Sequence, residues 1–167
     1  MLGGLCLISH SKEMFKNKSI VFLIIFLVLL IASLNFLAFS FYWYWRIWWF
    51  DLLMHFLGGM FVASLGYYFY YLLVSRERLS LFRLLILLIF SSLVIGGLWE
   101  IFEFSIDAYW SAHVNIKSLQ ILQAGSLDTL SDLLFDFLGA IAFGLFIHYI
   151  PLLPDNNLEK QKENHDN

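Results

Sequence analysis

Four long apolar runs constrain what this chain can fold into. They cover about residues 20–41, 50–74, 82–106 and 130–150 of the 167-residue sequence. About 20 apolar residues suffice for a helix to cross a bilayer, whereas a transmembrane β-strand is about half as long and alternates apolar with polar residues. We therefore expect an all-α, polytopic integral membrane protein built as a bundle of four transmembrane helices.

The composition supports this class and excludes others. Hydrophobic residues make up 60% of the chain and charged residues 14%, whereas soluble domains are about half apolar and a quarter charged. Cys6 is the single cysteine, so no intramolecular disulfide can form. No basic patch typical of nucleic-acid binding is present. The expected partners are membrane lipids, with homo-oligomer formation left open.

The basic residues predict the orientation in the membrane. Cytoplasmic loops are enriched in Lys and Arg, and eight of the ten basic residues fall in three segments that would then lie inside: Lys12, Lys16, Lys18, Arg76, Arg78, Arg83, Lys160 and Lys162. We expect a multi-pass protein of the cell (inner) membrane with a cytoplasmic N-terminal segment (1–19), a transmembrane domain (20–150) and a polar cytoplasmic tail (151–167).

Two segments are expected on the outer face. The stretch "FYWYWRIWWF", residues 41–50, is typical of an aromatic belt at headgroup depth, although it could also form a lid over a lipid-headgroup site. The residues between the third and fourth spans are expected to form a short amphipathic segment. Asp107 within this region is predicted to be interfacial, and His113 is a minor candidate ligand.

Acidic residues and one histidine interrupt three of the spans at matching spacings. Asp51 and His55 are four residues apart, Glu100 and Glu103 three apart, and the last span carries Asp128, Asp132 and Asp136 four apart. Such spacings put each set on one stripe of its helix. At 1.5 Å per residue, all three stripes lie about 25 to 30 Å or more from the inner ends of the spans, so they are expected to meet near the outer face.

This convergence predicts a polar site. Arg46 and Lys117 are the only basic residues expected on that side, and several carboxylates cannot all remain ionised at low dielectric without compensation. Carboxylates and neutral imidazole are normal ligands of divalent metals. The hypothesis is a divalent metal ion, of open identity, bound by Asp51, His55, Glu100, Glu103, Asp128 and Asp132.

The same acidic residues are also compatible with a site that holds no metal. Shared protons could compensate the carboxylates in place of an ion, and polar side chains inside bundles often serve only as hydrogen bonds between helices. Asp128 follows Gly125 and Ser126 and could simply cap the last helix.

Three motifs carry a resemblance to a known family. The sequences "DLLMHFLGG" (51–59), "WEIFE" (99–103) and "DTLSDLLFDFLGA" (128–140) resemble those of the YjdF-like proteins, uncharacterised bacterial inner-membrane proteins classed as a domain of unknown function. A looser similarity is to the VanZ-like membrane proteins. The resemblance implies the architecture and the site positions and supplies no known reaction. Some family members have an apolar residue at the position of Asp136, which therefore ranks below the other acids.

Three classes of function fit these observations. The first is a metal-dependent enzyme acting on lipid or envelope substrates, the second a proton- or cation-coupled carrier, and the third a non-catalytic membrane partner or resistance factor. The sequence contains no zincin motif, no phosphate-binding loop and no complete di-iron motif, so no known catalytic motif distinguishes these three classes. Whether the protein is an enzyme, and which residues would be catalytic, stays open at this level.

Overall fold

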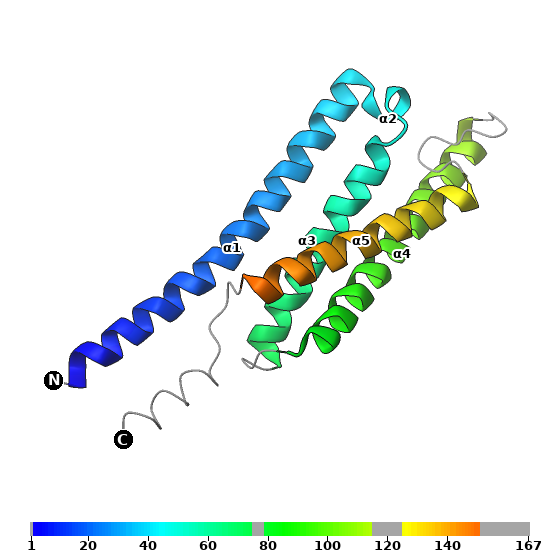
Figure 1. Ribbon diagram of the computed structural model, residues 1–167. Helices are drawn as coiled ribbons and strands as arrows, with labels where there is room; N and C mark the ends of the chain where they lie inside the picture. The colour runs from blue at the N-terminus through cyan, green and yellow to red at the C-terminus, as the bar shows by residue number, and fades with distance from the viewer. Residues whose placement is uncertain (1, 75–78, 115–124, 151–167) are drawn as a thin grey trace.

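The fold is all-helical, as predicted. The computed structural model describes residues 2–74, 79–114 and 125–150, which form the helices α1 (Leu2–Phe41), α2 (Trp43–Arg46), α3 (Phe50–Leu73), α4 (Leu81–Val114) and α5 (Ser126–Tyr149) (Figure 1). Four apolar stretches within the long helices are long enough to cross a membrane: Lys18–Phe41, Phe50–Leu73, Leu81–Trp110 and Ser126–Tyr149. The protein is a multi-pass membrane bundle.

Several helices extend beyond the predicted spans. Helix α1 begins at Leu2, and α4 continues past residue 106 to Val114. The sequence has no glycine or proline between Gly97 and Gly125, so nothing in the chain stops α4 earlier. The first part of the expected amphipathic segment is therefore a continuation of α4, and residues 115–124 lie outside the described residues. Helix α5 begins four residues before residue 130, directly after Gly125, whose φ of 122° suits glycine.

Three helices form the compact part of the bundle. Helices α3, α4 and α5 pack against one another, whereas α1 approaches α3 closely but neither α4 nor α5 along the described residues (Figure 1). Small residues permit the α3–α5 crossing. A Cβ atom added to Gly59 would overlap the backbone of Asp136, and one added to Gly139 would overlap the backbone of Phe56. Close backbone approach at small residues is the usual way in which membrane helices associate.

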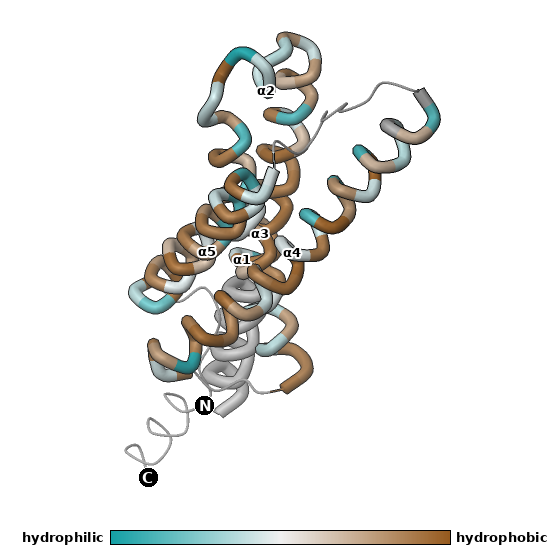
Figure 2. The backbone as a smooth tube through the Cα atoms, turned by 90° about the vertical axis from the view of Figure 1, so that its right-hand side faces the viewer, coloured by the Kyte–Doolittle hydropathy of each residue, from teal (hydrophilic) through white to brown (hydrophobic). Residues whose placement is uncertain are grey.

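The interior of the bundle changes character along its length. We call the end that carries α2 the α2 end. Away from it, the interior is an apolar cluster that includes Tyr67, Leu88, Phe143 and Ile147. Toward it, the buried residues include the apolar Phe50 and Met54, which pack near the aromatic turn, and a group of polar residues between α3, α4 and α5. Figure 2 shows teal segments among the mainly brown ones of the helices.

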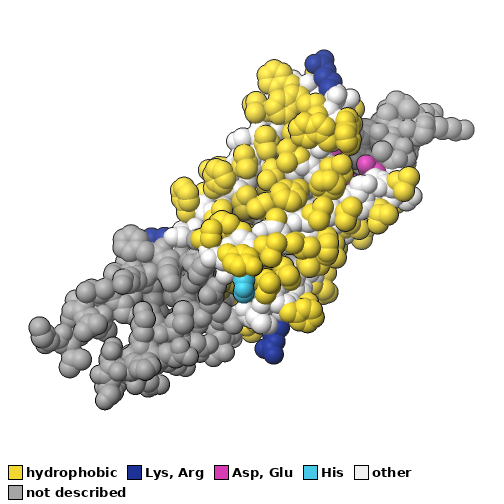
Figure 3. All heavy atoms as spheres, viewed as in Figure 1, with side chains coloured by type: hydrophobic (Ala, Val, Ile, Leu, Met, Phe, Trp, Pro, Cys, Tyr) yellow, Lys and Arg dark blue, Asp and Glu magenta, His cyan; other side chains and the backbone are white. Residues whose placement is uncertain are grey.

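The outer surface of the bundle is largely apolar. Bulky side chains such as Phe22, Phe36 and Phe90 are exposed along the helices, and hydrophobic atoms cover most of the described surface in one view (Figure 3). Such a surface suits contact with lipid tails and not with water.

The turn between α1 and α3 is built from aromatic residues. Tyr42 adopts a left-handed conformation with φ of 58°, which lets the chain reverse into α2. The Tyr44 hydroxyl donates a hydrogen bond of 2.6 Å to Asn35 Oδ1, and the Tyr44 ring packs edge-on against Phe50. Trp48 is 84% exposed. Part of the aromatic stretch thus anchors the turn to the bundle, while the rest faces outward as an interfacial belt would.

Candidate metal centre

The candidate site lies between α3, α4 and α5 near the α2 end. Helix α3 contributes His55, α4 contributes Glu100 and Glu103, and α5 contributes Asp132 and Asp136, all of which are buried or nearly so. His55 lies five residues from the start of α3, about 8 Å along the helix axis. The predicted convergence of three polar stripes is present in the structure.

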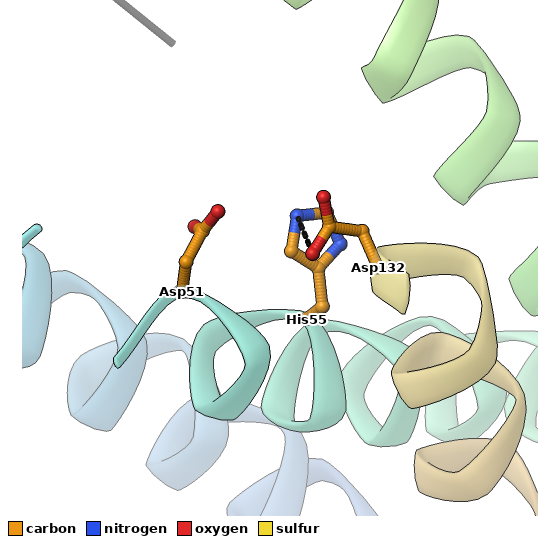
Figure 4. Close-up of side chains that lie close together, drawn as sticks. All are labelled: Asp51, His55 and Asp132. Atoms are coloured by element: carbon orange, nitrogen blue, oxygen red, sulfur yellow. Dashed lines mark ion pairs between the residues drawn. The ribbon is translucent and has the colours of Figure 1, made fainter. Parts of the chain in front are cut away.

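His55 is at the centre of the cluster. Its Nε2 atom is 3.9 Å from Glu100 Oε1 and 3.9 Å from Asp132 Oδ1, while Nδ1 is 3.6 Å from Asp136 Oδ2. The side chains of Asp51 and His55 project from the same side of α3, and Asp132 reaches toward the imidazole from α5, with the ion pair between His55 and Asp132 drawn as a dashed line (Figure 4). Nε2 of the imidazole therefore faces carboxylates from both α4 and α5, whereas Nδ1 faces Asp136 of α5.

Two sets of side chains have the spacing that a metal ion requires. In one set, a ligand atom from each of Asp51, His55 and Asp132 lies within 4.8 Å of the other two. The other set joins His55 to Glu100 and Glu103 under the same limit. Both sets share His55, so five of the six predicted ligands surround one small volume. An ion there could draw on nitrogen and oxygen ligands from three helices.

Two buried aspartate oxygens in this volume have no hydrogen bond among the described residues. Asp132 is 1% exposed and Asp136 is 4% exposed, and neither Asp132 Oδ1 nor Asp136 Oδ2 has a hydrogen-bond partner among the described residues. Buried polar oxygens are normally hydrogen-bonded, because leaving them unpaired costs about 1 to 3 kcal/mol each. Asp132 Oδ1 has only the 3.9 Å contact with His55 Nε2, and a cation between these two atoms would satisfy both as ligands.

Glu103 is positioned by its own helix. The Trp99 indole Nε1 donates a hydrogen bond of 2.8 Å to Glu103 Oε1. Trp99 lies one helical turn before Glu103 and is about half exposed, so the indole can shield this carboxylate from lipid while the other carboxylate oxygen stays available. The i, i+4 spacing in "WEIFE" could have predicted this contact from the sequence.

Asp136 is more central than the sequence suggested. The resemblance to the YjdF-like proteins ranked it below the other acids, yet its carboxylate is the closest of the three to the imidazole. It was already the third member of the predicted α5 stripe, at i+8 from Asp128. Its low rank as a metal ligand stays a prediction, because Asp136 belongs to neither metal set and faces Nδ1, while Glu100 and Asp132 face Nε2.

Other predicted residues have different surroundings. Asp128 is half-buried in the first turn of α5, whose N-cap is Gly125, and it belongs to neither metal set. It is therefore not the capping residue, although its position still favours the helix dipole. Asp107, expected at the interface, is buried one turn beyond Glu103. His113 is exposed and stacks on Tyr109, with Nδ1 2.8 Å from the Tyr109 carbonyl oxygen, so it does not join the cluster.

Tyr44 in the aromatic turn lies close enough to the cluster for the charges of its carboxylates to affect the pKa of the phenol. Burial raises the pKa of the Tyr44 phenol, and the carboxylates of Asp51 and Glu103 raise it further. A negative phenolate is disfavoured beside negative carboxylates. Tyr44 therefore stays neutral and can keep its hydrogen bond to Asn35.

The fold and this cluster define a class: a small multi-pass membrane protein whose three-helix core buries carboxylates around one histidine. Within that class, the chain belongs to the family described as "Predicted membrane protein (DUF2238)", whose profile matches residues 1–151. This confirms the prediction of a membrane protein family of unknown function, while the YjdF-like and VanZ-like resemblances stay predictions. Neither a curated protein nor a solved structure matches the chain.

Proposed function

We propose that this protein is a membrane-embedded divalent-metal-binding protein. The observation that carries the proposal is the convergence of His55 Nε2, Glu100 Oε1 and Asp132 Oδ1 from three helices, with the two carboxylates each 3.9 Å from the nitrogen. Asp51 and Glu103 lie within ligand range of the same imidazole and would supply further oxygen ligands to a bound ion. A mixed nitrogen and oxygen donor set suits Zn²⁺, Mn²⁺ or Fe²⁺ better than Mg²⁺ or Ca²⁺.

The balance of charge supports an ion in this place. Five carboxylates and one imidazole share the volume, whereas Arg46 is the only Lys or Arg among the described residues at the α2 end. Arg46 is exposed and lies over the Tyr42 ring. A divalent cation would offset the cost of burying these acids, which in a membrane interior are rare and functional by default.

The distribution of Lys and Arg supports an outward-facing site. With both termini in the cytoplasm of an inner-membrane protein, the α2 end faces outward, and the cluster lies at the depth of the outer lipid headgroups. An ion there would polarise a phosphoryl or ester oxygen or lower the pKa of a bound water. We therefore infer a metal-dependent enzyme acting on lipid or envelope substrates.

A carrier is less well supported by the same helices. The stretches 56–74, 84–99 and 137–147 contain no Asp, Glu, Lys, Arg or His. An ion that entered from the α2 end would therefore meet an apolar interior with Tyr67, Phe143 and Ile147 before it reached the other side. Ion pathways are normally lined by ionisable or polar groups, so this arrangement favours a binding site over a transport path.

Elemental analysis of untagged, purified protein tests the metal. Wild type is expected to hold about one equivalent of a divalent metal after washing with buffer, and His55→Ala and Asp132→Asn are expected to lose it. His113→Ala is the matched control, because it removes a histidine that lies outside the cluster, and it should retain the metal. A wild-type protein without metal that also fails to bind added Zn²⁺ or Mn²⁺ overturns the proposal.

The enzymatic part has a separate test. Metal-loaded protein in nanodiscs made from extracted bacterial lipids is incubated, and the lipids are compared by mass spectrometry with those treated with His55→Ala. A metal-dependent change in one lipid class is expected. If the lipid profile stays the same while the metal analysis succeeds, the protein binds metal in another role.

A further inference from the structure

Small residues on α3 and α4 leave room for Asp136. A Cβ atom at Gly59 would overlap its backbone, and one at Gly96 would overlap its carboxylate. The Ser92 hydroxyl donates a buried hydrogen bond of 3.1 Å to the Asp136 carbonyl oxygen. Two glycines and a serine therefore hold one aspartate in a fixed place, which indicates that its position matters more than its charge alone.

The two nitrogens of His55 face different groups. Nε2 faces Glu100 and Asp132 from two helices, whereas Nδ1 faces Asp136 at 3.6 Å. That distance is somewhat longer than a formed hydrogen bond, and contacts of this kind shorten when a ligand binds. An imidazole can offer only one nitrogen to a metal while the other keeps its proton.

We propose that Asp136 is a positioning residue, which accepts the Nδ1 proton of His55 and so directs the Nε2 lone pair toward the metal. Metal-binding histidines usually donate their second N–H to a carboxylate or a carbonyl, which fixes the tautomer and the ring orientation. Asp132, one turn earlier on α5, is then a ligand, and Asp136 is not. This inference rests on the proposed function for the metal, although the contact between Asp136 and Nδ1 exists without it.

Asp132 and Asp136 form a natural matched pair for the test. Asp132→Leu and Asp136→Leu make the same chemical change on the same helix and remove the acceptor while keeping the number and branching of the side-chain heavy atoms. We expect Asp132→Leu to abolish Zn²⁺ binding. Asp136→Leu should keep the stoichiometry and weaken the affinity about 10- to 100-fold.

A second pair moves the Asp136 carboxylate without changing any charge. An added methyl group at Gly96 would displace this carboxylate, whereas one at Gly97 meets nothing within 4 Å. Gly96→Ala should therefore weaken Zn²⁺ binding as Asp136→Leu does, and Gly97→Ala should match wild type. This pair keeps the inference testable even if a leucine at residue 136 prevents folding.

A spectroscopic readout separates positioning from a merely structural role. With isotope-labelled histidine, the Nδ1 proton of His55 should be protected from exchange with water in wild type, with or without Zn²⁺. The signal is assigned by its loss in His55→Ala. It should disappear in Asp136→Leu and Gly96→Ala and persist in Asp132→Leu and Gly97→Ala.

The outcomes distinguish this inference from the proposed function. A protected Nδ1 proton in both Asp136→Leu and Gly96→Ala overturns the inference, as does loss of Zn²⁺ stoichiometry in Asp136→Leu, which would make Asp136 a ligand. If wild type binds no metal but the Nδ1 proton depends on Asp136, the metal proposal fails. The inference that Asp136 accepts the Nδ1 proton of His55 and orients the imidazole is then still supported.

Discussion

The two halves of the α3–α4–α5 core differ in content although the same three helices build both. Toward the α2 end, the interior holds His55, Glu100 and Asp132, and away from it the interior holds Leu88 and Phe143. The apolar half needs no compensation inside a membrane. The polar half carries the desolvation cost of its carboxylates, so a protein that only needed to pack would not contain it.

This difference teaches where stability and function lie. Between membrane helices the hydrophobic effect contributes little, because lipid tails are as apolar as leucine, and close packing contributes most. The apolar half and the glycine contacts should therefore carry the stability of the fold. The polar half should cost stability unless a cation fills it.

The largest expected effect is at the helix crossing that joins the two halves. In Gly139→Val, the added side chain overlaps the backbone of Phe56 on α3, and backbone cannot move aside as a side chain can. The free energy of unfolding should fall by more than about 3 kcal/mol. Thermal melting in detergent measures it, with Gly97→Ala as the control. A melting curve like that of wild type would show that the α3–α5 crossing is not tight.

Phe143→Ala tests the apolar half by itself. Phe143 is fully buried and packs edge-on against Tyr67, so its removal leaves a cavity that costs about 3 kcal/mol. Zn²⁺ stoichiometry should be unchanged, since Phe143 lies in the apolar cluster. Loss of metal in a variant that is still folded would contradict the separation of the two halves.

Added metal should stabilise the polar half. At a free Zn²⁺ concentration about 100 times the Kd, linkage predicts a gain of about 2.7 kcal/mol in the free energy of unfolding. The gain should appear in wild type and Phe143→Ala and vanish in His55→Ala. An equal shift in all three proteins would mean that Zn²⁺ binds elsewhere.

Removing a buried acid should stabilise the metal-free protein. Asp132 is 1% exposed, and its Oδ1 has no hydrogen-bond partner among the described residues. The cluster buries several carboxylates around a single imidazole, so removing one of them relieves repulsion and desolvation. We therefore expect Asp132→Leu to stabilise the metal-free protein by about 1 to 2 kcal/mol. The melting of both proteins is compared after chelation. A clear loss of stability would show that Asp132 is a structural residue.

The smallest effect concerns Tyr44 and high pH. Burial and then the charges of Asp51 and Glu103 raise the pKa of this phenol above its ordinary value of 10.0, so the folded protein keeps the proton longer than the unfolded chain does. Above about pH 10 the unfolded chain binds fewer protons, and the free energy of unfolding falls as the pH rises. Between about pH 9 and about pH 11, Tyr44→Phe should lose less stability than wild type does. An identical loss would show that folding does not raise the pKa of the Tyr44 phenol.

The sequence predicted the four spans and most of the cluster. Span prediction succeeded because each run is apolar over the length of a bilayer, and the stripes succeeded because Asp51 and His55, like Glu100 and Glu103, repeat at helical spacing. The sequence did not predict the position of Asp136 beside Nδ1. That contact depends on how far α5 is rotated and how closely it approaches α3, and helical spacing determines neither.

The sequence alone determined that apolar helices cross the membrane and that their acids share a stripe and a depth, because hydropathy and helical periodicity are local properties. The tertiary structure decided which acid faces which nitrogen of His55. Those distances follow from the helix crossings at Gly59, Gly96 and Gly139, where residues from α3, α4 and α5 approach one another. Contacts between helices that are distant in the chain appear only once the bundle is packed.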